Sequence, residues 1–598
     1  MSTSNNGAMP SSLVAWEQKI LANPAVAGAL RQLFANWMGL PAGQYHVRLI
    51  ENFYVPAADG LPLATDRYEP AGVTAGPTIL MRTPYSKGAA GSLVAGLFAY
   101  QFATHGYHVV VQDCRGRFGS QSEDGGEFLP FLHEAADGAA TLDWIAQQTW
   151  SDGQVGMWGA SYLGYCQWAA ASAGSPYLKA LAPMITSSHL MSYPANGFPL
   201  DLLLRWMFQM QTMDTPNLSM LERMQRINDA GVQDRFLRRA FDHLPILTAD
   251  ELAIGHPGAL YREMAEADAT HEYWRVSDHS AAVGSAPPAD FTSGWYDLFL
   301  DGLLEDYTAQ LKAARTAGKP VPYLTIGPWS HLDTGYLPVA FTDGLAWFSA
   351  YLRGDRSKLR KRPVRLFVMG ARRWRSFESW PPPSKEYKLY LQGSGAQKTG
   401  RLRWQPVDAG ETAAGSANAT PDQFRYNPAL PTPNLGGAKM GTDAGQVDNR
   451  PLEERADVLI YTTPPLPGDV EIVGYVRAEL YVRSSLPYTD FFVRLCDVES
   501  SGRSLNVCDG NFRIEPGRGE LQPDGSLRVT VAMSATAYRF LTNHRIRIQV
   551  SSGAHPRFAR NLGVPEPQVM STTYQLADQT VYHDAIHPSA VVLPLVTG

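Results

Sequence analysis

The chain has 598 residues, of which 44% are hydrophobic and 18% charged, and its formal net charge is −6. This composition is typical of a soluble globular protein, and the length predicts roughly three to four domains rather than one core. Because the charge is slightly acidic and no run of Lys and Arg occurs, we expect neither a nucleic-acid partner nor a membrane partner.

Cysteine usage and the first residues bear on the cellular compartment. Cys114, Cys166, Cys496 and Cys508 form no Cys-x-x-Cys pair, so we expect no zinc or other metal site and a reducing compartment. A pairing of Cys496 with Cys508 across two strands stays open. The first nine residues lack a basic start and an apolar segment, so no signal peptide is expected. A cytoplasmic location is therefore predicted.

Patterns of apolar residues divide the chain. Residues 1–46 predict a helical N-terminal extension, because apolar residues recur near the helical period. Residues 47–189 and 288–357 alternate strand-like apolar runs with helical stretches, which predicts an α/β domain on a parallel sheet. Residues 190–287 break this alternation with helices rich in Met, Arg and aromatics. They predict a helical cap inserted into the α/β domain.

The last part of the chain has a different pattern. Residues 358–598 contain short alternating strands, beginning at Val364, separated by turns rich in Gly, Pro and Asn. This pattern predicts a C-terminal antiparallel β-sandwich of the jelly-roll type. Within it, residues 395–449 are expected to be mostly loops.

Ser161 stands in the most informative motif. An apolar strand-like run precedes it, and an Ala-rich helical stretch follows it. Gly159 and Gly164 flank the serine. This layout predicts a nucleophile elbow, a tight strand-to-helix turn that exposes the serine oxygen above a parallel sheet. In the usual pattern a Gly stands two residues after the Ser, whereas here that position is Leu163.

A serine nucleophile needs a base and an acid that orients the base. Asp297 and His331 each follow a strand-like segment after Ser161, in the chain order typical of α/β-hydrolases. Both should therefore lie at the carboxyl edge of the sheet, where the elbow opens. Asp297 as a helix cap and His331 as a loop residue are the ordinary alternatives. The sequence does not determine the first residue of the strand before Asp297, because residues 287–290 include two prolines.

Two tyrosines are candidates for oxyanion stabilisation. The backbone N–H of Tyr162 directly follows the nucleophile, and Tyr85 lies in a loop after an early strand and carries a phenol that can donate. A buried aromatic without a catalytic role is the alternative for Tyr85. Asp113 and Arg115 are interpreted as a structural ion pair.

Five motifs carry a family resemblance. In order they are Arg-Thr-Pro-Tyr-Ser-Lys at 82–87, Gln-Asp-Cys-Arg-Gly at 112–116, Gly-Ala-Ser-Tyr-Leu-Gly at 159–164, Gly-Trp-Tyr-Asp at 294–297 and Gly-Pro-Trp-Ser-His at 327–331. Together they resemble the cocaine esterase-like (CocE/NonD) serine hydrolase family, which is related to X-prolyl dipeptidyl aminopeptidases. The resemblance covers about residues 47–598, and Leu after Ser-Tyr is the family's own form of the elbow.

The resemblance implies an α/β-hydrolase core, a helical cap and a jelly-roll third domain with the active site at their junction. By position, it implies that Ser161 is the nucleophile, His331 the base and Asp297 the orienting acid. It also implies that the Tyr85 hydroxyl and the Tyr162 N–H form the oxyanion hole. Members hydrolyse esters and amides without a metal or organic cofactor. The first 45 residues exceed what the resemblance leads us to expect.

Two positions after Asp297 bear on the substrate. In the α-amino acid ester hydrolase branch, acidic residues stand two and three positions after the catalytic Asp, whereas here Phe299 and Leu300 do. Apolar residues cannot offset the desolvation of an ammonium, so free α-amino substrates are disfavoured unless Asp301 or a cap carboxylate supplies the charge. Phe299 instead predicts an aromatic wall of an acyl pocket. Trp206 could extend that wall, with a place in the cap core as its ordinary alternative.

We therefore predict a serine hydrolase that cleaves small-molecule esters, or amides, with a bulky apolar or aromatic acyl group through an acyl-enzyme. A biosynthetic acyltransferase and an X-prolyl-type peptidase are alternatives that use the same triad. A binding protein built on the jelly roll, with a dead hydrolase site, is the alternative from another class. The sequence leaves a homo-oligomer open.

Overall fold

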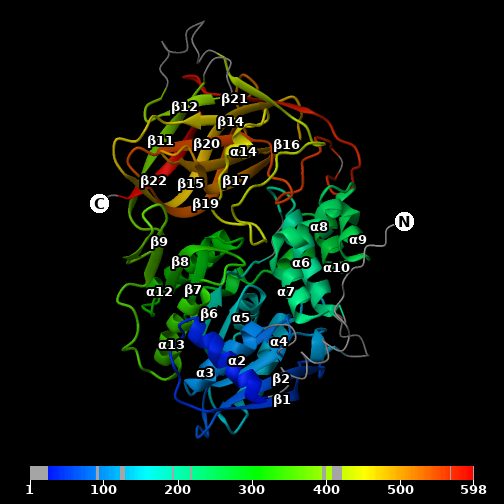
Figure 1. Cartoon of the computed structure of the whole chain (residues 1–598), viewed down its shortest axis with the longest axis vertical. Coiled ribbons are helices and arrows are strands. Elements are labelled where there is room, and N and C mark those ends of the chain that lie inside the picture. The colour runs from blue at the N-terminus through cyan, green and yellow to red at the C-terminus, as the bar shows by residue number, and fades with distance from the viewer. Residues whose placement is uncertain are drawn as a thin grey trace.

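A computed structural model of the chain describes residues 24–88, 93–121, 128–190, 194–215, 218–393, 399–406, 420–565 and 567–596. Three parts pack together in Figure 1: an α/β unit below, a group of helices at its right, and a β-rich domain above both. Of the predicted N-terminal extension, residues 1–23 lie outside the described residues, and residues 24–46 contain helix α2 (Pro24–Trp37). No helix in the described ranges is both long and apolar enough to cross a membrane.

The α/β unit is built on a ten-stranded sheet with the order β1-β2-β4-β3-β5-β6-β7-β8-β9-β10. Strands β3 to β9 are parallel to one another, whereas β1, β2 and β10 join in antiparallel pairs. The strands are β1 (Val47–Pro56), β2 (Pro62–Pro70), β3 (Gly76–Thr83), β4 (His108–Asp113), β5 (Ser151–Ala160), β6 (Leu178–Met184), β7 (Asp290–Tyr296), β8 (Tyr323–Ser330), β9 (Val364–Val368) and β10 (Arg373–Phe377).

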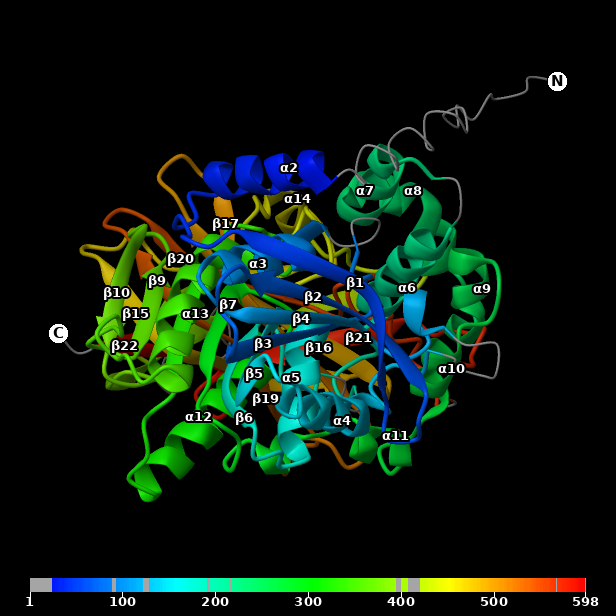
Figure 2. The same ribbon diagram turned by 90° about the horizontal axis from the view of Figure 1, so that it is seen from below.

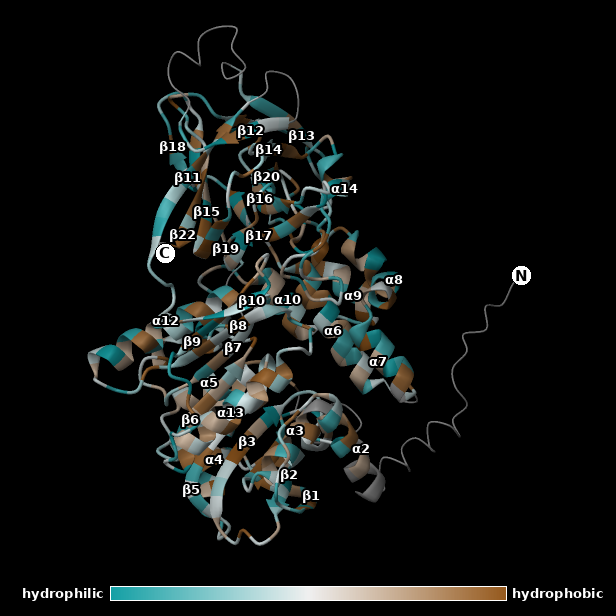
Figure 3. Ribbon diagram, turned by 60° about the vertical axis from the view of Figure 1, so that its left-hand side comes forward, coloured by the Kyte–Doolittle hydropathy of each residue, from teal (hydrophilic) through white to brown (hydrophobic). Residues whose placement is uncertain are grey.

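Helices cover both faces of this sheet (Figure 2). On one face, α3 (Leu93–Thr104) and α13 (Leu337–Leu352) pack aromatic side chains against the central strands. On the other face lie α4 (Glu134–Ala146), α5 (Tyr162–Ser172) and α12 (Leu300–Thr316). Apolar residues run through the strands, whereas many helices are striped with polar residues (Figure 3). Strands covered on both faces are buried along their whole length, as β3, β4 and β7 are.

The predicted helical insertion lies between β6 and β7. It consists of α6 (Leu200–Asp214), α7 (Met220–Asn228), α8 (Ala230–Phe241), α9 (Ala249–Ile254), α10 (Ala259–Glu266) and α11 (Glu272–Val276). Its apolar residues form one cluster with residues of α5 and with Cys114, directly after β4, rather than a separate core. The cap therefore closes over the carboxyl edge of the sheet.

The C-terminal domain is β-rich, as predicted. Its strands follow the order β13-β21-β15-β22-β11-β12-β14-β20-β16-β17, with β18 and β19 off this path. They are β11 (Ser384–Gln392), β12 (Thr399–Arg403), β13 (Asp422–Tyr426), β14 (Leu459–Thr462), β15 (Val470–Ser484), β16 (Thr489–Val498), β17 (Ser504–Ile514), β18 (Glu520–Leu521), β19 (Leu527–Phe540), β20 (Arg545–Ser551), β21 (Ala577–Tyr582) and β22 (Ala590–Val596), with the short helix α14 (Arg450–Glu453). Nearly all pairs are antiparallel, and the jelly-roll connectivity stays a prediction.

Two strands differ from the predicted boundary at residue 358. Strands β9 and β10 extend the sheet of the α/β unit, because β9 pairs in parallel with β8 and β10 pairs with β9. The prediction placed them in the third domain because Val364 opens an alternating run. Alternation marks a strand with one covered face, and β9 alternates in burial since it lies near the sheet edge.

Candidate active site

Ser161 occupies a strained turn between β5 and α5. Its backbone has φ 55° and ψ −121°, a conformation that L side chains rarely adopt. The Ser161 N–H donates to the Met184 carbonyl at 2.9 Å, which fixes the turn to the end of β6. Gly164 is required by close packing, since a Cβ there would meet Thr186 Cγ2 at 2.4 Å. The glycine three residues after Ser161 thus brings α5 against the segment that follows β6.

The structure brings Asp297 and His331 to Ser161. His331 Nε2 lies 3.1 Å from Ser161 Oγ, and His331 Nδ1 lies 2.7 Å from Asp297 Oδ2. Asp297 and His331 are both buried, and the second oxygen of Asp297 accepts the backbone N–H of Phe299 at 2.9 Å. This chain of contacts can pass the serine proton to the imidazole while the carboxylate holds the ring in place.

The strand that leads to Asp297 begins directly after the segment with the two prolines and is regular. Strand β7 begins at Asp290 and ends directly before Asp297, and all its residues are buried. Gly294 lies where β7 and β8 converge, because a Cβ there would meet the Trp329 carbonyl oxygen at 2.1 Å. This close approach brings the two strand ends, and with them Asp297 and His331, next to one another.

Tyr85 points its hydroxyl into the same site. Trp206 Nε1 donates to Tyr85 Oη at 3.3 Å, and Arg117 Nε donates to the Pro84 carbonyl at 2.9 Å, which holds the turn. Burial raises the pKa of Tyr85 to about 12, although hydrogen bonds with Trp206 and Ser161 act in the opposite direction. The phenol therefore keeps its proton at neutral pH and can donate it to an oxyanion.

The side chain of Tyr162 points away from the reacting serine. Its hydroxyl donates to Glu134 Oε1 at 2.8 Å and accepts the Phe131 N–H at 3.0 Å. Glu134 in turn pairs with Arg82 Nη1 at 2.6 Å, and both are buried. Tyr162 can therefore serve an oxyanion only through its backbone N–H, while Glu134 fixes the first turn of α5. Glu134 was missed by sequence reasoning because a single Glu far from the motif gives no signal.

A narrow cavity opens at Ser161, with free space of about 20 Å³, which is room for about one water molecule. Its lining is almost entirely apolar. Besides Ser161, His331 and the two tyrosines, it consists of Phe131, Leu190, Leu202, Trp206, Phe299 and Met440. Phe299 stands edge-on to the His331 ring, with centroids 5.3 Å apart. The predicted wall residues Phe299 and Trp206 thus lie where they were expected.

Met440 comes to the cavity from the third domain. It follows a loop whose Leu435 carbonyl accepts from Arg494 Nη1 at 2.7 Å. Arg494 is fully buried and is also paired with Asp509 at 3.0 Å. The loop belongs to residues 395–449, which the sequence predicted to be mostly loops, but no sequence pattern pointed to the arginine that holds it.

Several charged residues near the site have structural roles. Asp301 turns to the third domain and accepts from Ser534 Oγ at 3.1 Å, so it does not face the cavity. The predicted Asp113–Arg115 pair is wrong. Arg115 pairs with Asp59 and Asp137, because Asp113 already accepts the backbone N–H groups of Lys87 and Gly119.

Matches to two family models span most of the chain. Residues 59–333 match the X-Pro dipeptidyl-peptidase (S15 family) model, and residues 358–592 match the X-Pro dipeptidyl-peptidase C-terminal non-catalytic domain. The cocaine esterase of Rhodococcus sp. (strain MB1 Bresler) is 34% identical over 599 aligned residues, which cover 93% of this chain and 99% of that protein. The chain belongs to the cocaine esterase-like (CocE/NonD) serine hydrolase family.

Solved structures agree with this CocE/NonD fold. An α-amino acid ester hydrolase is similar at a TM-score of 0.73 with 23% identity, covering 93% of this chain and 97% of that one. A CocE/NonD family hydrolase from Staphylococcus aureus is similar at 0.63 with 15% identity, covering 92% and 94%. At these identities the two structures show the fold alone. The predicted family and fold class are thereby confirmed.

Proposed function

We propose that this CocE/NonD family member is a serine hydrolase that cleaves small-molecule carboxylic esters with an apolar or aromatic acyl group. The observation that carries the proposal is the hydrogen-bonded series from Ser161 through His331 to Asp297 at the floor of an apolar cavity. The similarity to a cocaine esterase over nearly the whole chain supports ester chemistry.

In the proposed mechanism Ser161 Oγ attacks the ester carbonyl while His331 Nε2 takes its proton. The Tyr85 hydroxyl and the Tyr162 backbone N–H stabilise the negative charge that develops on the carbonyl oxygen. His331 then protonates the leaving alcohol, and an acyl-enzyme remains on Ser161. Water activated by His331 releases the acid and restores the serine.

The cavity lining supports an uncharged acyl group. Apart from His331, no ionisable side chain other than the two tyrosines lines it among the described residues. An α-ammonium placed there would lose hydration without gaining a carboxylate, which is unfavourable. The lining thus disfavours both α-amino acid esters and the free N-terminus that an X-prolyl peptidase must hold.

The first test replaces the proposed nucleophile. We expect Ser161→Ala to lower the cleavage of a p-nitrophenyl ester by roughly 10⁴-fold or more, because the remaining site keeps only binding and oxyanion contacts. Ser172→Ala, at the other end of α5, is the matched control and should keep wild-type activity. Circular dichroism checks that both variants are folded. Wild-type rates in Ser161→Ala would contradict the proposal.

A second measurement addresses the acyl group. Wild-type kcat/KM is compared for benzoyl, acetyl and alanyl esters of one alcohol. We expect the uncharged acetyl and benzoyl esters to be cleaved faster than the alanyl ester, because the apolar lining offers no carboxylate to its free ammonium. A preference for the alanyl ester would contradict the proposed substrate class and leave Ser161 as the nucleophile.

A further inference from the structure

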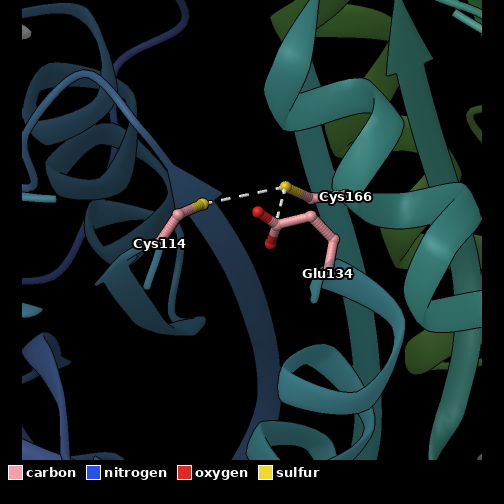
Figure 4. A group of neighbouring side chains, drawn as sticks. All are labelled: Cys114, Glu134 and Cys166. Carbon is pink, nitrogen blue, oxygen red and sulfur yellow. Dashed lines mark hydrogen bonds between the residues drawn. The ribbon is translucent and has the colours of Figure 1, made fainter. Parts of the chain in front are cut away.

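Two cysteines and a glutamate converge behind the nucleophile elbow. Cys114 directly follows β4, Glu134 begins α4, and Cys166 lies on α5 one helical turn after Tyr162. Figure 4 shows the two thiols pointing toward each other with the Glu134 carboxylate beside them. The sequence predicted no metal site because the four cysteines form no Cys-x-x-Cys pair. The fold brings their side chains together.

Two distances within this cluster are close to the edges of a tetrahedral metal site. Cys114 Sγ lies 3.9 Å from Cys166 Sγ, and Cys166 Sγ lies 3.7 Å from Glu134 Oε2. Zn–S bonds of about 2.3 Å at a tetrahedral angle separate two sulfurs by about 3.8 Å, and a sulfur and a carboxylate oxygen by about 3.5 Å. All three ligand atoms lie within 4.8 Å of one another.

We propose that Cys114, Glu134 and Cys166 form a binding site for one thiophilic divalent cation, Zn²⁺ in particular. Two sulfurs and one oxygen are the donor set of a zinc or cadmium site, and a water molecule would complete four-coordination. Binding displaces one proton from each thiol, and each sulfur then bonds to the cation. No oxidation or reduction takes place.

The surrounding charges accommodate such a cation. Without metal, the carboxylate of Glu134 is balanced by Arg82, which lies 2.6 Å away, and the thiols are neutral. One divalent cation in exchange for two thiol protons leaves the net charge of this buried cluster unchanged. The Tyr162 hydroxyl donates to Glu134 Oε1, and Arg82 Nη1 donates to Oε2, the oxygen that also faces Cys166. Both partners fix the carboxylate, as neighbours of metal ligands commonly do.

A disulfide fits this geometry less well. A covalent S–S bond is about 2.05 Å long, so the two sulfurs would have to approach by nearly 2 Å. Both side chains lie in the close-packed interior, with no exposed area on either cysteine, which resists such a shift. A cation between the sulfurs needs little movement.

The test uses Cd²⁺, whose thiolate bonds give a charge-transfer band in the ultraviolet. Chelator-treated wild-type protein is incubated with Cd²⁺ for hours at about pH 8, because both thiols are buried and must be reached by local opening. We expect about one Cd²⁺ per chain, the release of about two protons, and competition by Zn²⁺. The melting temperature should rise, since only the folded chain holds the site.

Variants decide whether these residues hold the ion. Cys114→Ser and Cys166→Ser should each lose the band, whereas the double variant Cys496→Ser/Cys508→Ser, which removes the other two buried thiols, should keep it. If the single variants do not fold, protection of Cys114 and Cys166 from alkylation in the Cd²⁺-treated wild type replaces them. A wild type without the band, a band that persists in Cys114→Ser, or a Cys114–Cys166 disulfide in peptide maps of untreated protein would overturn the proposal.

Discussion

At the scale of single residues, the proposed oxyanion donor Tyr85 is held by one indole. The Trp206 N–H donates to Tyr85 Oη, so a lone pair of the phenol is engaged and its own proton is free for the substrate oxygen. Trp206 also stacks on Tyr162, with ring centroids 6.3 Å apart and an interplanar angle of 13°. The cap thus positions the donor as well as closing the cavity.

Trp206→Phe separates these two roles. It keeps an aromatic wall and removes the N–H, so we expect kcat for a p-nitrophenyl ester to fall by about 2- to 10-fold with little change in KM. Tyr85→Phe should cost about 10²–10³-fold in kcat. In the double variant the Trp206 effect should disappear, because the hydrogen bond has already lost its acceptor. An undiminished Trp206 effect in the Tyr85→Phe background would show that the indole acts on the substrate alone.

At the scale of elements, helix α12 anchors the segment that leads from the elbow region into the cap. Asp306 is buried and accepts both the N–H and the hydroxyl of Ser188, at 2.7 and 2.5 Å. Burial raises the pKa of Asp306 to about 7, against about 3.9 for an Asp in an unfolded chain. The folded protein therefore holds a proton on Asp306 at pH values where the unfolded chain has lost it.

This pKa difference predicts a pH-dependent stability. The contribution of Asp306 is complete below about pH 4 and is lost as the pH rises through about 7, because the carboxylate must then ionise in a buried place. Asp306→Asn cannot ionise, so the melting temperature of wild type relative to this variant should fall between about pH 4.5 and 8. The exposed Asp152→Asn should show no such trend. Parallel curves for wild type and Asp306→Asn would rule out the raised pKa.

A loop of the third domain limits the cavity. Met440 is buried against Ser161's pocket, so Met440→Ala should enlarge it. We expect kcat/KM for benzoyl over acetyl esters to rise by about 10-fold, in line with about 1–3 kcal/mol for small changes in an apolar pocket. Met224→Ala, half exposed on α7, is the control. An unchanged ratio in Met440→Ala would place the acyl group elsewhere.

At the scale of the whole molecule, the sequence pointed to the candidate triad more readily than to the residues that support it. Ser161, Asp297 and His331 could be found because each ends a strand-like run, and parallel strands deliver their carboxyl ends to one edge. Glu134, Arg494 and Met440 act through contacts between distant segments, which leave no local pattern. Strand β9 was assigned to the wrong domain for a related reason. Its alternating sequence pattern, which is typical of a strand near a sheet edge, is the same as that of the strands in the C-terminal domain.

The third domain also holds the strand that carries the acid. Tyr296, directly before Asp297, donates to the Asn506 carbonyl at 2.9 Å in a buried position. Tyr296→Phe leaves that carbonyl without this donor, so we expect a loss of about 1–3 kcal/mol in stability, seen as a lower melting temperature, together with a lower kcat. The exposed Tyr54→Phe is the control. A stable variant with reduced kcat would instead show that the bond acts only on the position of Asp297.

Because Arg494 fixes a loop of the C-terminal domain beside the cavity, bond cleavage and the shape of the cavity depend on different parts of the chain. In the proposed function the α/β unit supplies the residues that break the ester bond. Residues 435–440, attached to a different sheet, supply part of the wall beside Ser161. Substitutions in that loop can thus alter substrate preference without touching a reacting atom. Replacing residues 435–440 with the corresponding residues of a relative could therefore transfer the acyl-group preference of that relative to this protein. The buried arginine and the backbone carbonyl that it binds would have to be retained.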